Sequence, residues 1–386
     1  MLPSPMAFLR FLFLLAVFVC LPIVTAAQQP VPARIRQPID EAKLTVLKGN
    51  TYPLARVEFD RGPAASDLPL NRMLLVLKRS PQQEAALEAL LDAQQDKSSP
   101  NYHGWLTPEE FGKQFGPADQ DIQAITSWLS GHGFQVSRIS KGRLIIEFSG
   151  NAGQLQASFH TAIHKYTVNG EDHWANSSDP QIPAALAPVV AGIDSLNNFP
   201  RRPMSELVGT FSRNKVTGKI TLVKPAFTFP YQNTELYALG PYDFSTIYNV
   251  ASLWTSGLNG SGQRIGIVAE TDINPQDFSD FHAIFGQTSP APVLNVIHDG
   301  PDPGVTGDEP EADIDTQWSS GIAPGATVDF VVDESTETTA GVDLSAEYIV
   351  DNNLDPVMSE SYGLCELGLG TTGNTYRSEL WEQAAA

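Results

Sequence analysis

The sequence contains almost no cysteine. Of its 386 residues only Cys20 and Cys365 are cysteines, and Cys20 lies in an apolar run that we expect to be removed. The mature chain would then hold one thiol, which excludes an internal disulfide. Export without disulfides is typical of prokaryotic extracytoplasmic proteins, and we expect that origin.

Long apolar runs are also scarce. The run at the N-terminus, FLFLLAVFVCLPIV, follows Arg10 and is short for a membrane span. The segment TAAQQP then offers small residues for cleavage near Ala26 or Ala27. This pattern predicts a signal peptide at residues 1–27 and a secreted protein without membrane attachment after cleavage.

Basic residues are nearly missing from the C-terminal third. Residues 241–386 hold 24 Asp and Glu but only two basic residues, Arg264 and Arg377. The first 240 residues therefore hold 44 − 24 = 20 acidic and 24 − 2 = 22 basic side chains. A surface this acidic excludes binding to nucleic acid or anionic lipid. It suits work at low pH, where protonated carboxylates stop repelling one another.

The apolar content of 42% is enough for real cores, and the length favours two domains. Residues 30–200 alternate strand and helix patterns, with a hairpin expected around Asn169-Gly170. Helices are expected to start at Ser80-Pro81 and at Thr107. We predict an α+β domain, an antiparallel sheet with helices on one face.

Residues 201–240 are rich in Pro and Thr without periodicity, which predicts a linker. From 241 to 386, the unbroken apolar strands QRIGIVAE and ATVDFVVDE and a third strand, PVMSESYG, alternate with helix patterns. This alternation predicts a parallel sheet in a doubly wound α/β domain. The chain ends inside a helix pattern, TYRSELWEQAAA, so we interpret residues 241–386 as the N-terminal part of that domain.

The stretch GDEPEADIDTQWSSGIAPGA, residues 307–326, packs five carboxylates into eight positions. One interpretation is an acidic helix start, since Pro310 and carboxylates suit a first turn. A calcium loop is a second, but DIDTQWSSG has no Gly at its sixth place. A catalytic carboxylate pair is the third. Glu311 and Asp315, or equally Glu309 and Asp313, would share a helix face, so that one pKa rises and the pair serves as a base at acid pH.

Several segments resemble the sedolisins, the acid-acting serine-carboxyl peptidases. Their pattern is a Glu, three residues, an Asp and a short run into Ala-Pro-Gly-Ala, and that register selects Glu311 and Asp315. SSPNYHGWLTPEEFGKQFGPADQDIQAITSWLSGHGF is similar to the pro-kumamolisin activation domain, and HWANSSDPQIPAALAPVVAGIDSLNNF resembles its end. PYDFSTIYNV resembles the entry into the peptidase domain.

The resemblance implies a subtilisin-like catalytic domain that cleaves protein or peptide substrates and is inhibited by its own prodomain. Glu311 would be the base for a serine nucleophile, and Asp315 would orient Glu311. The serine, in a Gly-Thr-Ser segment, and a calcium site would both lie beyond residue 386, so we expect no cofactor and no activity in this chain. A further Asp stabilises the oxyanion. SYGLCELGLG, residues 361–370, offers only Glu366 for that role, and an exposed loop acid is an equal interpretation.

Two alternatives remain. The chain could be a degenerate, non-catalytic relative that acts as a secreted inhibitor or binding protein. Asp272 and His298 also follow the Asp-then-His order of ordinary subtilisins, although HDGPDPG lacks the helix start of those enzymes. For activation, the slightly basic first domain should bind the acidic second domain near neutrality, and acid should weaken that attraction.

Overall fold

The computed structural model describes residues 31–194, 196–203, 209–213, 220–225, 240–287 and 291–386. The predicted signal peptide and most of the predicted linker lie outside these residues. Among the described residues, no helix is both long enough and apolar enough to cross a bilayer. Residues 31–386 form one compact unit.

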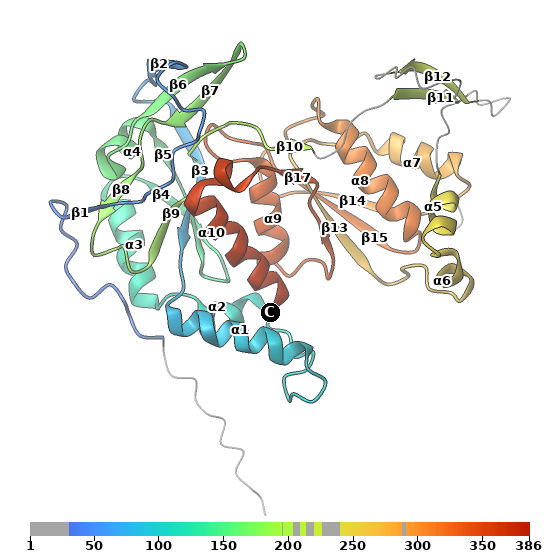
Figure 1. The fold of residues 1–386 in the computed structure, drawn as a ribbon, viewed down its shortest axis with the longest axis horizontal. Coiled ribbons are helices and arrows are strands. Elements are labelled where there is room, and N and C mark those ends of the chain that lie inside the picture. Colours follow the sequence, from blue (N-terminus) through green and yellow to red (C-terminus); the bar gives the residue numbers. More distant parts are fainter. Residues whose placement is uncertain (1–30, 195, 204–208, 214–219, 226–239, 288–290) are drawn as a thin grey trace, which may run out of the picture. The chain divides into compact units, whose positions relative to one another are not determined.

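The first half is built on a four-stranded antiparallel sheet in the order β4-β5-β3-β9 (Figure 1). A smaller antiparallel sheet, β2-β6-β7, contains the predicted hairpin. Asn169 (φ 53°) and Gly170 (φ 88°) turn that hairpin, because both positions need left-handed backbone. The strands are β2 (Asp60–Pro63), β3 (Pro69–Leu77), β4 (Gln135–Ile139), β5 (Ile145–Asn151), β6 (Ile163–Val168), β7 (Glu171–Asn176) and β9 (Val190–Ile193).

The helices of this half begin where the sequence predicts. Ser80 and Thr107 each accept a hydrogen bond from the backbone three residues on, and the side chains of Gln83 and Glu110 bond back to complete capping boxes. The antiparallel α+β prediction is therefore confirmed. The helices are α1 (Pro81–Gln95), α2 (Pro108–Phe115), α3 (Asp119–Gly131) and α4 (Ala152–Phe159).

Strand β3 is buried on both faces. Met73 and Leu75 pack into a core with residues of α3 and α4. Leu74 and Val76, pointing the other way, pack into a second core with residues of α9 (Gly341–Asp351) and α10 (Glu366–Ala385). The sequence predicted helices on one face only. Helices α3 and α4 lie on one face as predicted, but residues of α1 and α2 join α9 and α10 in the core on the other face, so the expectation of helices on one face only is wrong.

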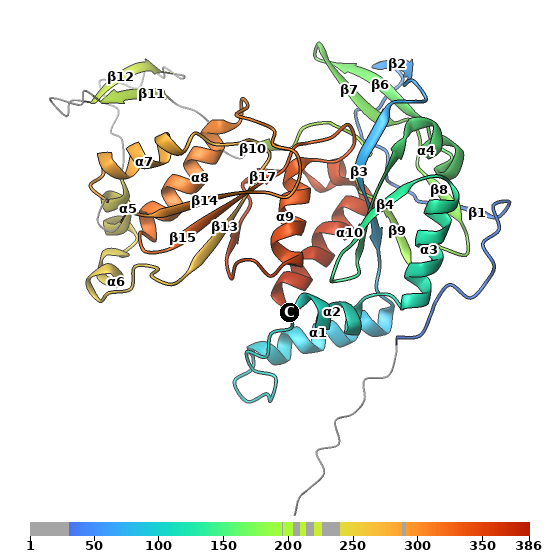
Figure 2. The same ribbon diagram turned by 180° about the vertical axis from the view of Figure 1, so that it is seen from behind.

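The second half contains a parallel sheet in the order β14-β15-β13-β16. Residues of α8 pack on one face and residues of α9 on the other, with α7 beside α8 (Figure 2). This confirms the predicted parallel sheet with helices on both faces. The elements are β13 (Arg264–Ala269), α7 (Pro275–Ile284), β14 (Val293–His298), α8 (Glu309–Ile322), β15 (Thr327–Val332) and β16 (Met358–Ser359).

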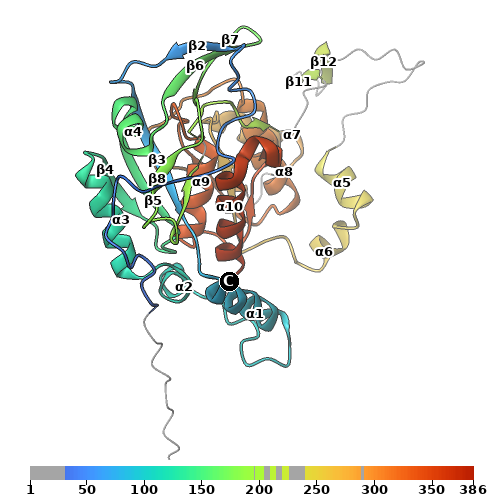
Figure 3. The same ribbon diagram turned by 60° about the vertical axis from the view of Figure 1, so that its left-hand side comes forward.

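The remaining elements are short, except for α10, which lies beside α9 (Figure 3). The predicted strand PVMSESYG pairs only at β16 and at β17 (Tyr362–Gly363), where β17 bonds to β10 (Arg202–Pro203). Strands β11 and β12, both within the predicted linker, pair in antiparallel orientation. The other short elements are β1 (Leu44–Val46), β8 (Gln181–Pro183), β11 (Gly209–Arg213), β12 (Ile220–Pro225), α5 (Pro241–Ile247) and α6 (Ala251–Thr255).

Candidate active site

Helix α8 carries both candidate carboxylate pairs, and it turns them toward different neighbours. Asp315 accepts a hydrogen bond from the Ser361 hydroxyl (2.9 Å), in the segment between β16 and β17. Glu311 is only 3% exposed and lies near enough to Asp315 to interact electrostatically with it. This pair therefore faces the carboxyl end of the parallel sheet, where ligands bind in open α/β folds.

The second pair points elsewhere. Asp313 accepts a hydrogen bond from Gln317 (2.9 Å) on its own helix. Burial and the carboxylates of Asp277, on α7, and Glu309 raise the pKa of Asp313 to about 6. Asp313 thus belongs to the contact between α8 and α7 rather than to the sheet edge, and Glu309 interacts with Asp313. The structure separates two pairs that sequence spacing leaves equivalent.

The surroundings of Asp315 raise the pKa of its carboxyl group. Burial and the nearby Glu311 carboxylate raise the pKa of Asp315 to about 6, against the opposing hydrogen bond from Ser361. At pH 5 Asp315 therefore carries a proton and the pair holds less negative charge than at neutrality.

Two further groups near the pair are missed by sequence reasoning. Glu270 directly follows β13. Burial raises the pKa of its carboxyl group to about 6, and the nearby carboxylates of Asp308 and Asp343 add to this effect. The buried Tyr362 hydroxyl has no hydrogen-bond partner among the described residues. Burial and the carboxylates of Asp308, Glu270, Glu311 and Asp315 raise the pKa of Tyr362. Glu270 directly follows β13, and Tyr362 lies three residues after the end of β16. A position just beyond the end of a parallel strand is the sequence signal that could have identified both residues.

Glu366, the candidate oxyanion residue, is the first residue of α10 and is exposed. Cys365 precedes it and has an exposed free thiol. Both follow β17 and therefore the Ser361–Tyr362 segment. The oxyanion role of Glu366 stays a prediction.

Gly325, in the APGA segment after α8, occupies a position where a larger side chain would clash with its neighbours. A Cβ on Gly325 would lie 2.7 Å from Asn259 Oδ1 and 2.9 Å from the Ser261 nitrogen. The Gly325 N–H also donates to the Asn259 carbonyl (2.9 Å). Helix α8 is thus fixed against the turn that leads into β13, which holds Glu311 and Asp315 relative to the sheet.

Arg72 of β3 joins the two halves of the chain next to this edge. Its guanidinium donates to Asp333 (2.6 Å), Asp299 (2.8 Å) and Glu147 (3.3 Å). Asp299 and Asp333 directly follow β14 and β15, and the Asp333 side chain is 0% exposed. Burial raises the pKa of Asp333 to about 6, although Arg72 opposes it.

More charges of opposite sign meet across the same contact. Arg138 pairs with Glu347 on α9, and Arg201, itself 4% exposed, donates to the buried Asp343 (2.7 Å). The Asp351 carboxylate, at the end of α9, accepts the backbone N–H groups of Lys141 (2.9 Å) and Gly142 (3.0 Å). The basic first half and the acidic second half therefore meet through specific ion pairs.

These carboxylates predict an unusual pH dependence of stability. A carboxyl whose pKa is higher in the folded chain than in the unfolded chain stabilises the fold below pH 4 and loses that contribution as the pH rises through the folded pKa. The groups raised to about 6 or 8 are Glu270, Asp313, Asp315, Asp333, Glu347, Asp355 and Glu379.

We therefore expect the urea midpoint of unfolding to rise as the pH falls from 8 to about 5. The Asp315→Asn variant has no carboxyl to titrate and should show a smaller rise. A midpoint that stays constant or falls over this range would contradict the assigned pKa directions.

Among the described residues, one group of His and Asp side chains has the spacing of a metal site: Asp272, His298 and Asp302. It includes a ring nitrogen, whereas calcium prefers oxygen ligands only. The group therefore does not fit the calcium site that the resemblance implies, and that site stays a prediction.

The chain is similar to known proteins over much of its length. The sequence model described as "Pro-kumamolisin, activation domain" matches residues 59–199. Sedolisin of Pseudomonas sp. is 26% identical over 312 residues, which cover 78% of this chain and 50% of that protein. Xanthomonalisin of Xanthomonas sp. is 25% identical over 357 residues, which cover 88% of this chain and 41% of that protein. Tripeptidyl-peptidase sed1 of Aspergillus fumigatus is 25% identical over 273 residues.

The chain spans half or less of the length of these relatives. The matches with sedolisin and xanthomonalisin each cover more than three quarters of this chain, so they include residues on both sides of the linker. These matches support a sedolisin-family precursor, in which residues 59–199 match the pro-kumamolisin activation domain.

Proposed function

We propose that this chain is part of a secreted zymogen of an acid-acting serine-carboxyl endopeptidase, inhibited by its own prodomain. The observation that carries the proposal is the hydrogen bond from Ser361 to Asp315 at the carboxyl end of the parallel sheet, with the buried Glu311 close enough to Asp315 to interact with it. The same sheet, with α8 on one face and α9 on the other, supports a subtilisin-like catalytic domain.

The chemistry follows from the protonation of the pair. Near pH 5 Asp315 holds a proton because its pKa is about 6. Asp315 can then donate a hydrogen bond, and Glu311 takes the role of base for a serine hydroxyl. A histidine base would be protonated at this pH and could not accept that proton. A carboxylate pair is therefore the suitable base for acyl transfer in acid.

The prodomain contact supports the inhibited state. Arg72 occupies the sheet edge between Asp299 and Asp333, on the side where the carboxylate pair also lies. Protein or peptide substrates would approach that edge in a doubly wound fold. Secretion rests on the predicted signal peptide at residues 1–27.

The coding sequence beyond residue 386 provides the first test. An open frame that continues into a Gly-Thr-Ser segment supports the zymogen, whereas a stop codon there supports a non-catalytic inhibitor or binding protein. The continued protein should then cleave a denatured protein at about pH 4 and remain inactive at about pH 7. Activity that is highest at neutral pH would refute the carboxylate-base assignment.

A further inference from the structure

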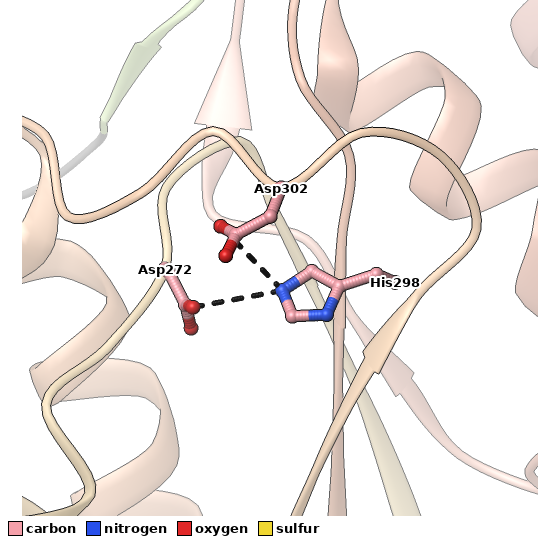
Figure 4. Close-up of side chains that lie close together, drawn as sticks. All are labelled: Asp272, His298 and Asp302. Carbon is pink, nitrogen blue, oxygen red and sulfur yellow. Dashed lines mark ion pairs between the residues drawn. The ribbon is translucent and has the colours of Figure 1, made fainter.

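Three side chains that the proposed peptidase chemistry does not use meet at the carboxyl end of the parallel sheet. His298 is the last residue of β14, Asp272 follows β13 by three residues, and Asp302 lies in the loop after β14. Both carboxylates converge on the same ring nitrogen of His298 (Figure 4). The sequence places Asp272 and His298 26 positions apart, and the fold brings them together.

The distances are those of ligands around an ion. His298 Nε2 lies 3.5 Å from Asp272 Oδ2 and 3.7 Å from Asp302 Oδ1, and the three ligand atoms all lie within 4.8 Å of one another. These separations are too long for hydrogen bonds. An ion bound at 2.0–2.2 Å in tetrahedral geometry holds its ligand atoms ~3.4 Å apart. A small cation therefore fits between these atoms with little movement.

The backbone already holds the ligands in place. The Asp272 N–H donates to the Gly304 carbonyl (2.9 Å), and the Gly304 N–H donates to Asp302 Oδ1 (2.7 Å). The Ile273 N–H donates to Asp272 Oδ1 (2.7 Å) and leaves Oδ2 toward His298. Two loops from different strands are thus joined around the group, which lowers the entropy cost of binding an ion.

We propose that Asp272, His298 and Asp302 bind a divalent transition-metal ion of the zinc type. One imidazole nitrogen and two carboxylate oxygens suit zinc, while calcium and magnesium prefer oxygen ligands only. The side chains are 21%, 32% and 55% exposed for Asp272, His298 and Asp302, so an ion from solvent reaches them and a fourth position stays open to water.

The ion would act on the loop that precedes α8. It would connect the loop after β13 to the loop after β14, and the second loop leads directly into the helix that carries Glu311. Asp299, next to His298, binds Arg72 of the prodomain. The site is therefore placed to stiffen the region between the catalytic helix and the prodomain contact.

Calorimetric titration of the full chain with zinc chloride at about pH 7.5, where imidazole is mostly neutral, tests the proposal. We expect saturable binding of one equivalent and a zinc-dependent rise in melting temperature. His298→Ala and Asp302→Asn should each weaken binding at least tenfold. His164→Ala is the matched control, because His164 contacts only one carboxylate, that of Asp60 (2.9 Å), and it should bind zinc as the unaltered chain does.

The proposed zinc site would be overturned by an absence of saturable zinc binding, or by an unchanged affinity for zinc in His298→Ala. Circular dichroism of each variant shows whether it folds. If His298→Ala does not fold, Asp302→Asn decides alone, since its side chain is 55% exposed and its loss should leave the fold intact.

Discussion

Replacing Glu311 with glutamine should abolish acid proteolysis in a protein that continues through the serine segment. Glutamine keeps the size and hydrogen-bonding capacity of the side chain but cannot accept the serine proton. Loss of a comparable base in serine peptidases lowers kcat by roughly 10⁴-fold or more, and the remainder comes from substrate binding and oxyanion stabilisation. Initial rates with a denatured protein substrate at about pH 4 measure the effect.

Glu309→Gln is the matched control for this experiment. It makes the same chemical change two residues away on α8, but Glu309 interacts with Asp313, whose other acidic neighbour is Asp277 of α7. We expect Glu309→Gln to keep nearly full activity. Equal losses in the two variants would mean that the helix, rather than the Glu311 carboxylate, carries the effect, and retained activity in Glu311→Gln would refute the assignment.

Replacing Arg72 with methionine should destabilise the chain strongly at neutral pH and weakly in acid. Without Arg72, the fully buried Asp333 loses its strongest partner. A buried charge left unpaired costs ~3–5 kcal/mol. In acid the cost shrinks, because Asp333, with a pKa of about 6 even beside Arg72, becomes neutral. Urea unfolding at about pH 8 and pH 4.5 measures both values.

A second change separates charge from packing in this variant. Adding Asp333→Asn to Arg72→Met should restore most of the lost stability at about pH 8, because no buried charge is left at Asp333. Arg56→Met is the control, since the Arg56–Glu58 pair is more than half exposed on both sides and should contribute little. A loss in Arg72→Met that is equal at both pH values would contradict this explanation.

The ion pairs also modify the expected activation by acid. Although burial opposes it, Arg72 holds the pKa of Glu147 below its usual value, and Arg201 with Arg377 does the same for Asp343. Such groups stabilise the folded chain above pH 4, in the case of Asp343 through its pair with Arg201 across the contact, and lose that contribution as the pH falls through their lowered pKa. Asp333, whose pKa is raised, has the opposite effect between pH 4 and 6, because its contribution to stability grows as the pH falls. We therefore expect the prodomain contact to weaken only below about pH 4, rather than just below neutrality.

Local patterns predict most of the fold because they depend on neighbouring residues. The helix starts at Ser80 and Thr107 and the hairpin at Asn169-Gly170 are examples. The second covered face of β3 depends on residues nearly three hundred positions later, which no local pattern reveals. The predicted strand PVMSESYG is interrupted between β16 and β17, where Ser361 turns to Asp315.

The candidate site shows the same limit. The spacing of four residues predicts a carboxylate pair on α8, but the choice of pair depends on which face of the helix meets α7 and which meets Ser361. Glu270 and Tyr362 become visible only once the ends of the parallel strands are known. The meeting of Asp272 and His298 depends on β14, a strand that the sequence analysis did not predict.

The double-faced burial of β3 has a consequence for maturation. Leu74 and Val76 share one core with residues 342–380, so the two halves are held together by packed side chains as well as by the covalent chain. A single cut in the predicted linker breaks one peptide bond and leaves this core intact. Maturation would then require two separate events, hydrolysis followed by dissociation, and the nicked particle would persist until the second event exposes that apolar surface to water.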